Sequence, residues 1–155
     1  MTALTLPRRT FLAGSGLSML GALTATRAAS AQRSDGETRN VALVNDFCAA
    51  WSTRDLQRVT ALMADDSVYR MTETTPPLTG HAALIAQMQP WVDTSSSIEF
   101  KILETFASGP LVMNHRVDHF ASATRPLTWE GVGVFFVRDG KIQEWSDYTI
   151  GVKRE

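Results

Sequence analysis

The sequence predicts one α+β domain, in which three helices come before a mostly antiparallel sheet. Apolar residues recur at helical spacing between residues 41 and 91, and from residue 97 onward they alternate with polar residues, as in half-buried strands. Asp139-Gly140, between two apolar runs, adds the signature of a β-hairpin. Helices followed by strands, with no repeat, favour this fold class over a βαβ architecture.

The composition is that of one soluble globular domain: 155 residues, 44% hydrophobic and 20% charged. A net charge of -1 gives no reason to expect nucleic acid or an anionic membrane as a partner. The single cysteine, Cys48, excludes an internal disulfide and a cysteine-cluster metal site. Its place on the apolar side of a predicted helix indicates a packing role.

The first 31 residues have the order of a bacterial export signal. Arg8-Arg9 precede a short apolar run, and Ala29-Ser30-Ala31 provides a small-x-small ending. The paired arginines favour the twin-arginine type, which dedicated export machinery recognises. Glycines and serines dilute the apolar run, so an uncleaved membrane anchor is the less favoured alternative. We expect an export signal at residues 1–31, a polar linker at 32–39 and a domain at 40–155 of an exported, periplasmic protein.

Three helices are expected where apolar residues fall on one side, at residues 41–51, 56–63 and 81–91. Ser52 and Asp55 have the spacing of a capping box ahead of the second helix, and Asp65-Asp66-Ser67 is expected to end it. Pro90 is expected to distort or end the third helix.

The strands are expected at residues 68–71, 97–102, 111–120, 127–137 and 141–150. Pro76-Pro77 places a loop between residues 72 and 80. Gly131 and Gly133 interrupt the strand at 127–137, which indicates a bend or bulge there.

The strand at residues 111–120 holds the strongest functional candidates. Asn114, Arg116 and Asp118 share one face, while His115 and His119 share the other, because side chains alternate along a strand. Neither face is apolar enough to show which one looks inward. Arg116 and Asp118 are therefore either a salt bridge at a wet surface or a charged pair in a pocket.

Other candidates have simpler structural interpretations. His115 and His119 would lie about 13 Å apart along the strand, too far to bind one metal ion. Asp65 and Asp66 are better interpreted as solvated acids than as a metal pair. Among the four tryptophans, Trp129 is the best candidate for a pocket wall, because polar residues flank it on the other face of its strand.

Four segments resemble the limonene-1,2-epoxide hydrolase family, within the NTF2-like (cystatin-like, SnoaL-like) group. They are the segment from Asp65-Asp66 through Tyr69 to residues 76–80, Arg116-Val117-Asp118, residues 133–142, and Trp145-Ser146-Asp147-Tyr148. The third segment recurs in NTF2-like proteins of unrelated function, but Arg-x-Asp combined with Trp-x-Asp-Tyr is more specific. The resemblance covers about residues 40–150. It implies a cone in which N-terminal helices pack on a curved sheet.

The resemblance also implies an activity. Asp147 would be the base that takes a proton from water, Asp118 the acid that protonates an epoxide oxygen, and Arg116 the group that holds both carboxyls. Tyr69 matches a tyrosine that helps to hold the water. The family needs neither a metal nor an organic cofactor, acts on small apolar substrates and often forms homodimers, for which an exposed sheet face would be the interface.

One position departs from the family. Met71 stands where the family has an asparagine that also holds the water, and methionine cannot donate a hydrogen bond. Thr72 could take this role, since the loop that follows is one residue longer than in the family. Otherwise the water is held less well or the pocket performs another reaction. Glu73 is an additional acid without a family counterpart.

Two other functions remain open from the sequence. An isomerase or cyclase of the ketosteroid-isomerase or SnoaL kind would use Asp118 or Asp147 together with Tyr69. A non-catalytic ligand-binding or dimerisation module would use the fold alone.

Overall fold

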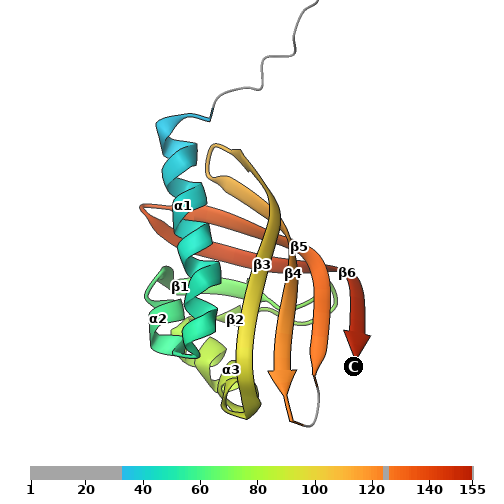
Figure 1. The fold of residues 1–155 in the computed structure, drawn as a ribbon. Coiled ribbons are helices and arrows are strands. Elements are labelled where there is room, and N and C mark those ends of the chain that lie inside the picture. Colours follow the sequence, from blue (N-terminus) through green and yellow to red (C-terminus); the bar gives the residue numbers. More distant parts are fainter. Residues whose placement is uncertain (1–32, 124–125, 155) are drawn as a thin grey trace, which may run out of the picture. The chain divides into compact units, whose positions relative to one another are not determined.

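The computed structural model describes residues 33–123 and 126–154 (Figure 1). The predicted export signal at residues 1–31 lies outside the described residues. Within them, no helix is both long and apolar enough to span a membrane. The helical elements are α1 (Asp35–Ala50), the short 3-10 helix η1 (Trp51–Thr53), α2 (Leu56–Thr60) and α3 (His81–Thr94).

In the described part of the chain, all strands belong to one six-stranded sheet of order β2-β1-β6-β5-β4-β3. The sheet is antiparallel except between β1 and β6, and it curves beneath α1 (Figure 1). The α+β fold, with N-terminal helices packed on a curved and mostly antiparallel sheet, is therefore confirmed. The strands are β1 (Met63–Arg70), β2 (Leu78–Thr79), β3 (Ser95–Ser108), β4 (Leu111–Ser122), β5 (Leu127–Arg138) and β6 (Lys141–Arg154).

The helix α1 begins inside the predicted linker, so the prediction of a linker at residues 32–39 is wrong from Asp35 onward. Ser34 and Glu37 form a capping box, which satisfies backbone N–H groups at the start of the helix. Glu37 also accepts a hydrogen bond from the backbone nitrogen of Gly109, and Asn40 donates to the Gly109 carbonyl. These contacts fix the polar first turns of α1 against the β3–β4 turn.

The second helix is shorter than predicted. It ends at Thr60, and the capping box predicted at Ser52 and Asp55 is not formed. Asp55 is itself the N-cap and accepts hydrogen bonds from two backbone nitrogens, while the Ser52 hydroxyl donates to the Ala49 carbonyl. Residues 65–67, predicted to end this helix, instead lie within β1, which starts at Met63.

Pro90 does not end α3, which continues to Thr94. The proline is on the exposed side of the helix, and the Thr94 hydroxyl donates back to the Pro90 carbonyl. The structure accommodates the proline within the helix even though its ring removes one hydrogen bond, to the carbonyl of Ala86. The predicted hairpin at Asp139-Gly140 is confirmed, since both residues have the positive φ angles of a tight turn, 52° and 71°.

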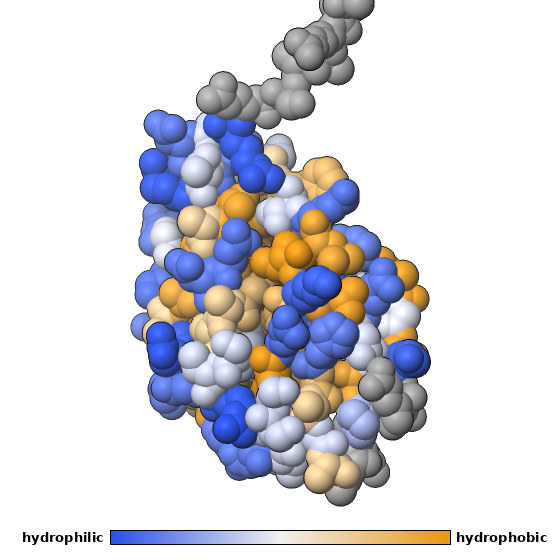
Figure 2. Space-filling model, in the orientation of Figure 1, coloured by the Kyte–Doolittle hydropathy of each residue, from blue (hydrophilic) through white to orange (hydrophobic). Residues whose placement is uncertain are grey.

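The core lies between the inward face of the sheet and the helices. It contains an aromatic cluster in which Phe47 and Trp51 of α1 and η1 pack against Phe135 of β5 and Trp145 of β6. Over β3, β4 and β5, hydrophobic and hydrophilic residues are interspersed on the surface (Figure 2). The exposed large apolar side chains of the sheet are Leu103, Phe106, Tyr148, Ile150 and Val152.

Candidate active site

The polar face of β4 looks inward. Asn114, Arg116 and Asp118 have exposed fractions of 0%, 1% and 1%, while His119 on the other face is exposed. The salt-bridge interpretation at a wet surface is therefore wrong, and the charged pair lies inside the fold. Buried charges of this kind are stable only when they are paired and hydrogen-bonded.

Arg116 is the centre of the buried polar group. Its Nε donates to both carboxyl oxygens of Asp118 at 3.0 Å, and its Nη2 donates to Oδ1 of Asp147 at 2.8 Å. Its Nη1 donates to Oδ1 of Asn114 at 3.1 Å. One guanidinium thus connects a residue of β6 with two residues of its own strand.

Two glycines of β5 make this connection possible. Gly131 and Gly133 are the inward-facing residues of β5 opposite Arg116 and Asn114 on β4. A Cβ added at Gly133 would overlap Nη1 of Arg116. The predicted irregularity is confirmed, because the β5–β6 register shifts between Glu130 and Gly131. The role of Gly133 as the gap through which Arg116 reaches β6 was not predicted from the sequence.

Aromatic rings surround the guanidinium. The Cζ atom of Arg116 lies 4.9 Å from the ring centroid of Phe100, 4.8 Å from that of Trp129 and 5.9 Å from that of Trp145. Such contacts stabilise a buried cation. Trp145 also donates from Nε1 to Oδ1 of Asp147 at 2.8 Å, so this oxygen accepts two hydrogen bonds.

The electrostatics of the site favour one shared proton. Burial raises the pKa of Asp118 to about 7, although Arg116 opposes the shift. Burial also raises the pKa of Asp147, against the opposing effects of Arg116 and Trp145. Burial alone would lower the pKa of Arg116, but the two carboxyls raise it, so the arginine stays charged. One ionised and one protonated carboxyl balance this charge.

The two carboxyls line a cavity of about 380 Å³. The polar lining residues are Tyr69, Thr72, Gln87, Asp118 and Asp147. The rest is lined mainly by apolar residues, which are Met71, Met88, Trp91, Phe100, Phe120, Leu127, Trp129 and Trp145. All residues predicted to form the site or its pocket therefore lie at this cavity or, like Arg116, directly behind its wall.

Tyr69 lines the cavity with its ring stacked on Trp145 at a centroid distance of 3.9 Å. Burial raises the pKa of Tyr69 well above its usual value, so the hydroxyl stays protonated and can donate. Thr72 forms a hydrogen bond with the Thr75 hydroxyl, in which either can be the donor. Met71 adds an apolar side chain to the cavity lining.

Glu73 lies outside the cavity and fastens the loop that carries Met71 and Thr72. Its carboxylate accepts a hydrogen bond from the backbone nitrogen of Thr149 at 2.6 Å. The Thr149 hydroxyl accepts in turn from Nε1 of Trp129 at 3.1 Å. Thr149 therefore connects the loop that carries Met71 and Thr72 with Trp129.

The remaining candidates lie elsewhere. His115 pairs with Glu130 at 3.0 Å, and His119 contacts the Thr128 hydroxyl. Asp65 and Asp66 are exposed, as predicted, although on a strand. Among residues 33–123 and 126–154, no group of three or more metal-ligating side chains comes together.

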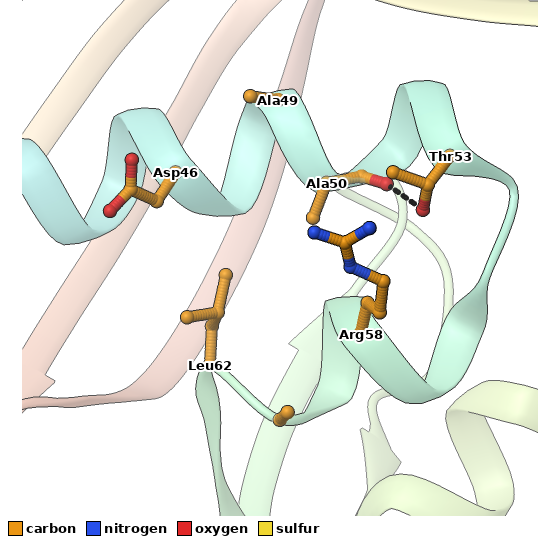
Figure 3. Close-up of a pocket in the computed structure, with 7 residues that line it drawn as sticks. Asp46, Ala49, Ala50, Thr53, Arg58 and Leu62 are labelled. Carbon is orange, nitrogen blue, oxygen red and sulfur yellow. Dashed lines mark hydrogen bonds between the residues drawn. The ribbon is translucent and has the colours of Figure 1, made fainter.

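A second hollow, of about 430 Å³, lies between α1 and α2 (Figure 3). Its lining includes Asp46, Thr53, Arg58 and Leu62, and in the close-up the Arg58 side chain points toward α1. Most of this lining is exposed, and it contains no buried carboxyl. The hollow therefore lacks the buried acid groups that mark the cavity beside Arg116.

Sequence reasoning grouped Asn114 with Arg116 and Asp118 but gave it no role. Its full burial and its contact with Nη1 place it in the site. The signal in the sequence was its position two residues before Arg116 on the same strand face.

Comparison with known proteins gives a consistent assignment. Residues 44–145 match the SnoaL-like domain. No curated protein matches the chain. The fold is similar to that of an LEH-like epoxide hydrolase of M. tuberculosis, with a TM-score of 0.62 and 29% identity over 73% of this chain and 84% of that one.

Two more distant structures share the fold alone. One is a candidate polyketide cyclase from Xanthomonas campestris pv. campestris, with a TM-score of 0.64 and 22% identity over 73% of this chain and 91% of that one. The other is a protein with a ketosteroid isomerase-like fold from Catenulispora acidiphila, with a TM-score of 0.62 and 18% identity over 68% and 83% of the two chains.

Proposed function

The chain belongs to the SnoaL-like (NTF2-like) domain family, and on this premise we propose that it is an epoxide hydrolase, which adds water to an apolar epoxide by acid–base catalysis. The proposal rests on the pairing of Asp118 and Asp147, which line a mainly apolar cavity, with one buried guanidinium. Epoxide hydration needs a proton removed at one point and delivered at another, and two carboxyls with different protonation states can divide this work.

In the proposed reaction Asp147 takes a proton from a water molecule as the water oxygen attacks an epoxide carbon. The carbon–oxygen bond of the ring breaks, and Asp118 gives its proton to the departing oxygen, which yields a diol. Oδ1 of Asp147 is held by Arg116 and Trp145, so the other carboxyl oxygen is the one proposed to receive the proton. Tyr69 is proposed to hold the water. Arg116 balances the charge before and after the step, since one carboxyl is ionised in both states.

The proposal is tested with purified protein and a panel of apolar epoxides, with diol formation as the readout. Asp118→Asn and Asp147→Asn are expected to lower turnover by about a hundredfold or more, the usual contribution of a positioned acid or base. Asp66→Asn, which changes an exposed acid of β1, is the control. Absence of diol from every epoxide, or normal turnover in both variants, would contradict the proposal.

A second candidate is an isomerase or cyclase acting at a carbon next to a carbonyl. Protonated Asp118 and the Tyr69 hydroxyl, which both line the cavity, could donate hydrogen bonds to an enolate oxygen while Asp147 moves the proton. Proton exchange at such a carbon without diol formation would favour this activity. Full burial of Arg116 counts against a binding module without catalysis. Burying a charged arginine and its carboxyl partners costs desolvation free energy, which a module without catalysis would have no reason to retain.

We also propose that two copies pair through the outer face of the sheet. Phe106 of β3 and Ile150 of β6 are 58% and 62% exposed. Lys101 and Glu104 of β3 are also exposed, so copies related by a two-fold axis can place opposite charges together. A dimer in sedimentation that Phe106→Glu converts to a monomer is expected; a native monomer would contradict it.

A further inference from the structure

One buried polar contact of the site has no part in the proposed proton transfers. Asn114 is fully buried, and its Oδ1 accepts the hydrogen bond from Nη1 of Arg116. Its amide nitrogen donates to Sγ of Cys48 on α1 at 3.4 Å. The side chain is therefore fixed between the arginine and the helix.

The shape of the guanidinium gives this contact a consequence. The group is planar, with the N–H bonds of Nε and Nη2 on one edge and Nη1 on the other. Asp118 and Asp147 lie at the first edge. Asn114 and the gap above Gly133 lie at the second, around Nη1.

We propose that Asn114 is a positioning residue, which together with the gap at Gly133 fixes Nη1 and so directs Nε to Asp118 and Nη2 to Asp147. A guanidinium free at Nη1 could turn and form a two-point pair with a single carboxyl, a geometry that arginine favours. Asp118 and Asp147 would then no longer each receive a hydrogen bond from a different nitrogen of Arg116. Asn114 prevents this by occupying Nη1 with a neutral acceptor.

The other titratable groups around Arg116 leave the carboxyls as the ones that change charge near neutral pH. Burial raises the pKa of Cys48 to about 12 and that of Tyr69 well above its usual value, so both stay protonated. Glu73 is exposed and lies beyond Asp147. The groups facing Arg116 are thus Cys48 from α1, Tyr69 from β1, Asp118 from β4 and Asp147 from β6.

The proposal predicts an order of pKa values for Asp118. The Asn114 oxygen carries partial negative charge and offsets part of the arginine charge. Asn114→Leu removes this oxygen, so Asp118 experiences more of the positive charge and its pKa falls. Asn114→Asp adds a carboxyl that competes for the same cation, so the pKa of Asp118 rises by about one unit or more. The pKa of Asp118 is therefore expected to be lowest in Asn114→Leu, intermediate in the native protein and highest in Asn114→Asp.

The test is a pH titration of the side-chain carboxyl carbons by 13C NMR on the full chain without substrate. The same order is expected for the alkaline limb of kcat, because Asp118 must be protonated to act as the acid. Only this kinetic measurement rests on the proposed function. The order of the Asp118 pKa values measured by NMR tests the positioning role of Asn114 even if the protein hydrates no epoxide. Val112→Ala is the matched control, since Val112 is fully buried on the same face of β4. It should lower stability without moving the titration of Asp118.

Equal titration of Asp118 in the native, Leu and Asp proteins, or the reverse order, would overturn the proposal and leave Asn114 as a space-filling residue. Asn114→Asp replaces a single heavy atom of the side chain. Its comparison with the native protein therefore decides the question even if Asn114→Leu does not fold.

Discussion

Arg116 and Asp147 are joined at 2.8 Å although their strands, β4 and β6, are not neighbours. Adjacent strands lie about 4.8 Å apart, so the arginine side chain crosses the whole of β5 to reach its partner. At this point β5 has Gly133, which is in register with both Asn114 and Asp147. The ion pair therefore depends on a residue without a side chain as much as on the charged residues.

Gly133→Ala is expected to lower kcat/KM by about a hundredfold, because displacement of a catalytic group by a fraction of its contact distance has effects of this size. The new methyl group would overlap Nη1 of Arg116 and force the guanidinium away. Gly151→Ala on β6 is the control, since a Cβ there meets nothing within 4 Å. Diol formation and thermal unfolding measure the two effects separately, and full activity in Gly133→Ala would show that the gap is not needed.

Stability is expected to fall as the pH rises from about 4 to about 7. The native pKa of Asp118 is about 7, above the 3.8 of an unperturbed carboxyl, so the folded protein binds this proton more tightly than the unfolded chain. The proton is lost on unfolding in this window, and rising pH therefore favours unfolding. Each unit of such a shift corresponds to about 1.4 kcal/mol.

Chemical denaturation at a series of pH values measures this dependence. Asp118→Asn should remove much of the decrease in the free energy of unfolding with rising pH. The decrease that remains is due to Asp147, whose pKa is also raised. Asp66→Asn, at an exposed position, should retain the native dependence. A native free energy of unfolding that stays constant or rises between pH 4 and 7 would contradict the buried, protonated state of Asp118.

Tyr69→Phe is expected to lower kcat by about tenfold, the effect of one lost hydrogen bond of roughly 1.4 kcal/mol. The phenyl ring keeps the stacking on Trp145, so the melting temperature should change little. Tyr148→Phe is the matched control, because Tyr148 is 47% exposed on the outer face. Steady-state kinetics distinguish the two, and equal effects of both changes would remove Tyr69 from the reaction.

Thr149→Val is expected to raise KM with little change in kcat. Valine has the shape of threonine but cannot accept the hydrogen bond from Trp129, whose ring covers Arg116 at the cavity wall. The ring would then be free to enter the space used by the substrate. Thr128→Val, which removes a hydroxyl bonded to His119 instead, is the control. An unchanged KM in Thr149→Val would show that Trp129 is held by packing alone.

The fold was largely predictable because its signals are local. The Asp139-Gly140 turn appears in the structure at the predicted position, and the alternation after residue 97 falls in β3, which at Ser95–Ser108 is longer than the predicted 97–102. The start of α1 was missed because its first turn is polar and is held by contacts with Gly109, far away in the sequence. The continuation of α3 past Pro90 was missed because the helix is also held by burial of Val92, which the local proline signal does not include.

The site was predictable in its members but not in its geometry. Alternation placed Arg116 and Asp118 together on one face, and resemblance added Asp147 and Tyr69. Whether that face is buried depends on how α1 and η1 cover the sheet, which is a property of the whole fold. For the same reason the sequence indicated only a bend or bulge at Gly133. That Gly133 pairs with Asn114 on β4 and with Asp147 on β6 depends on the strand register, which the sequence does not give.

The central claim is that a water molecule activated by Asp147 attacks the epoxide directly. A single turnover in H2 18O, with protein in excess over an accepted epoxide, tests it by mass spectrometry of both product and protein. One 18O atom is expected in the diol and none in the carboxyl of Asp147. Label in the Asp147 carboxyl would reveal a covalent ester intermediate, and with it a reaction in which Asp147 is the nucleophile and not the base.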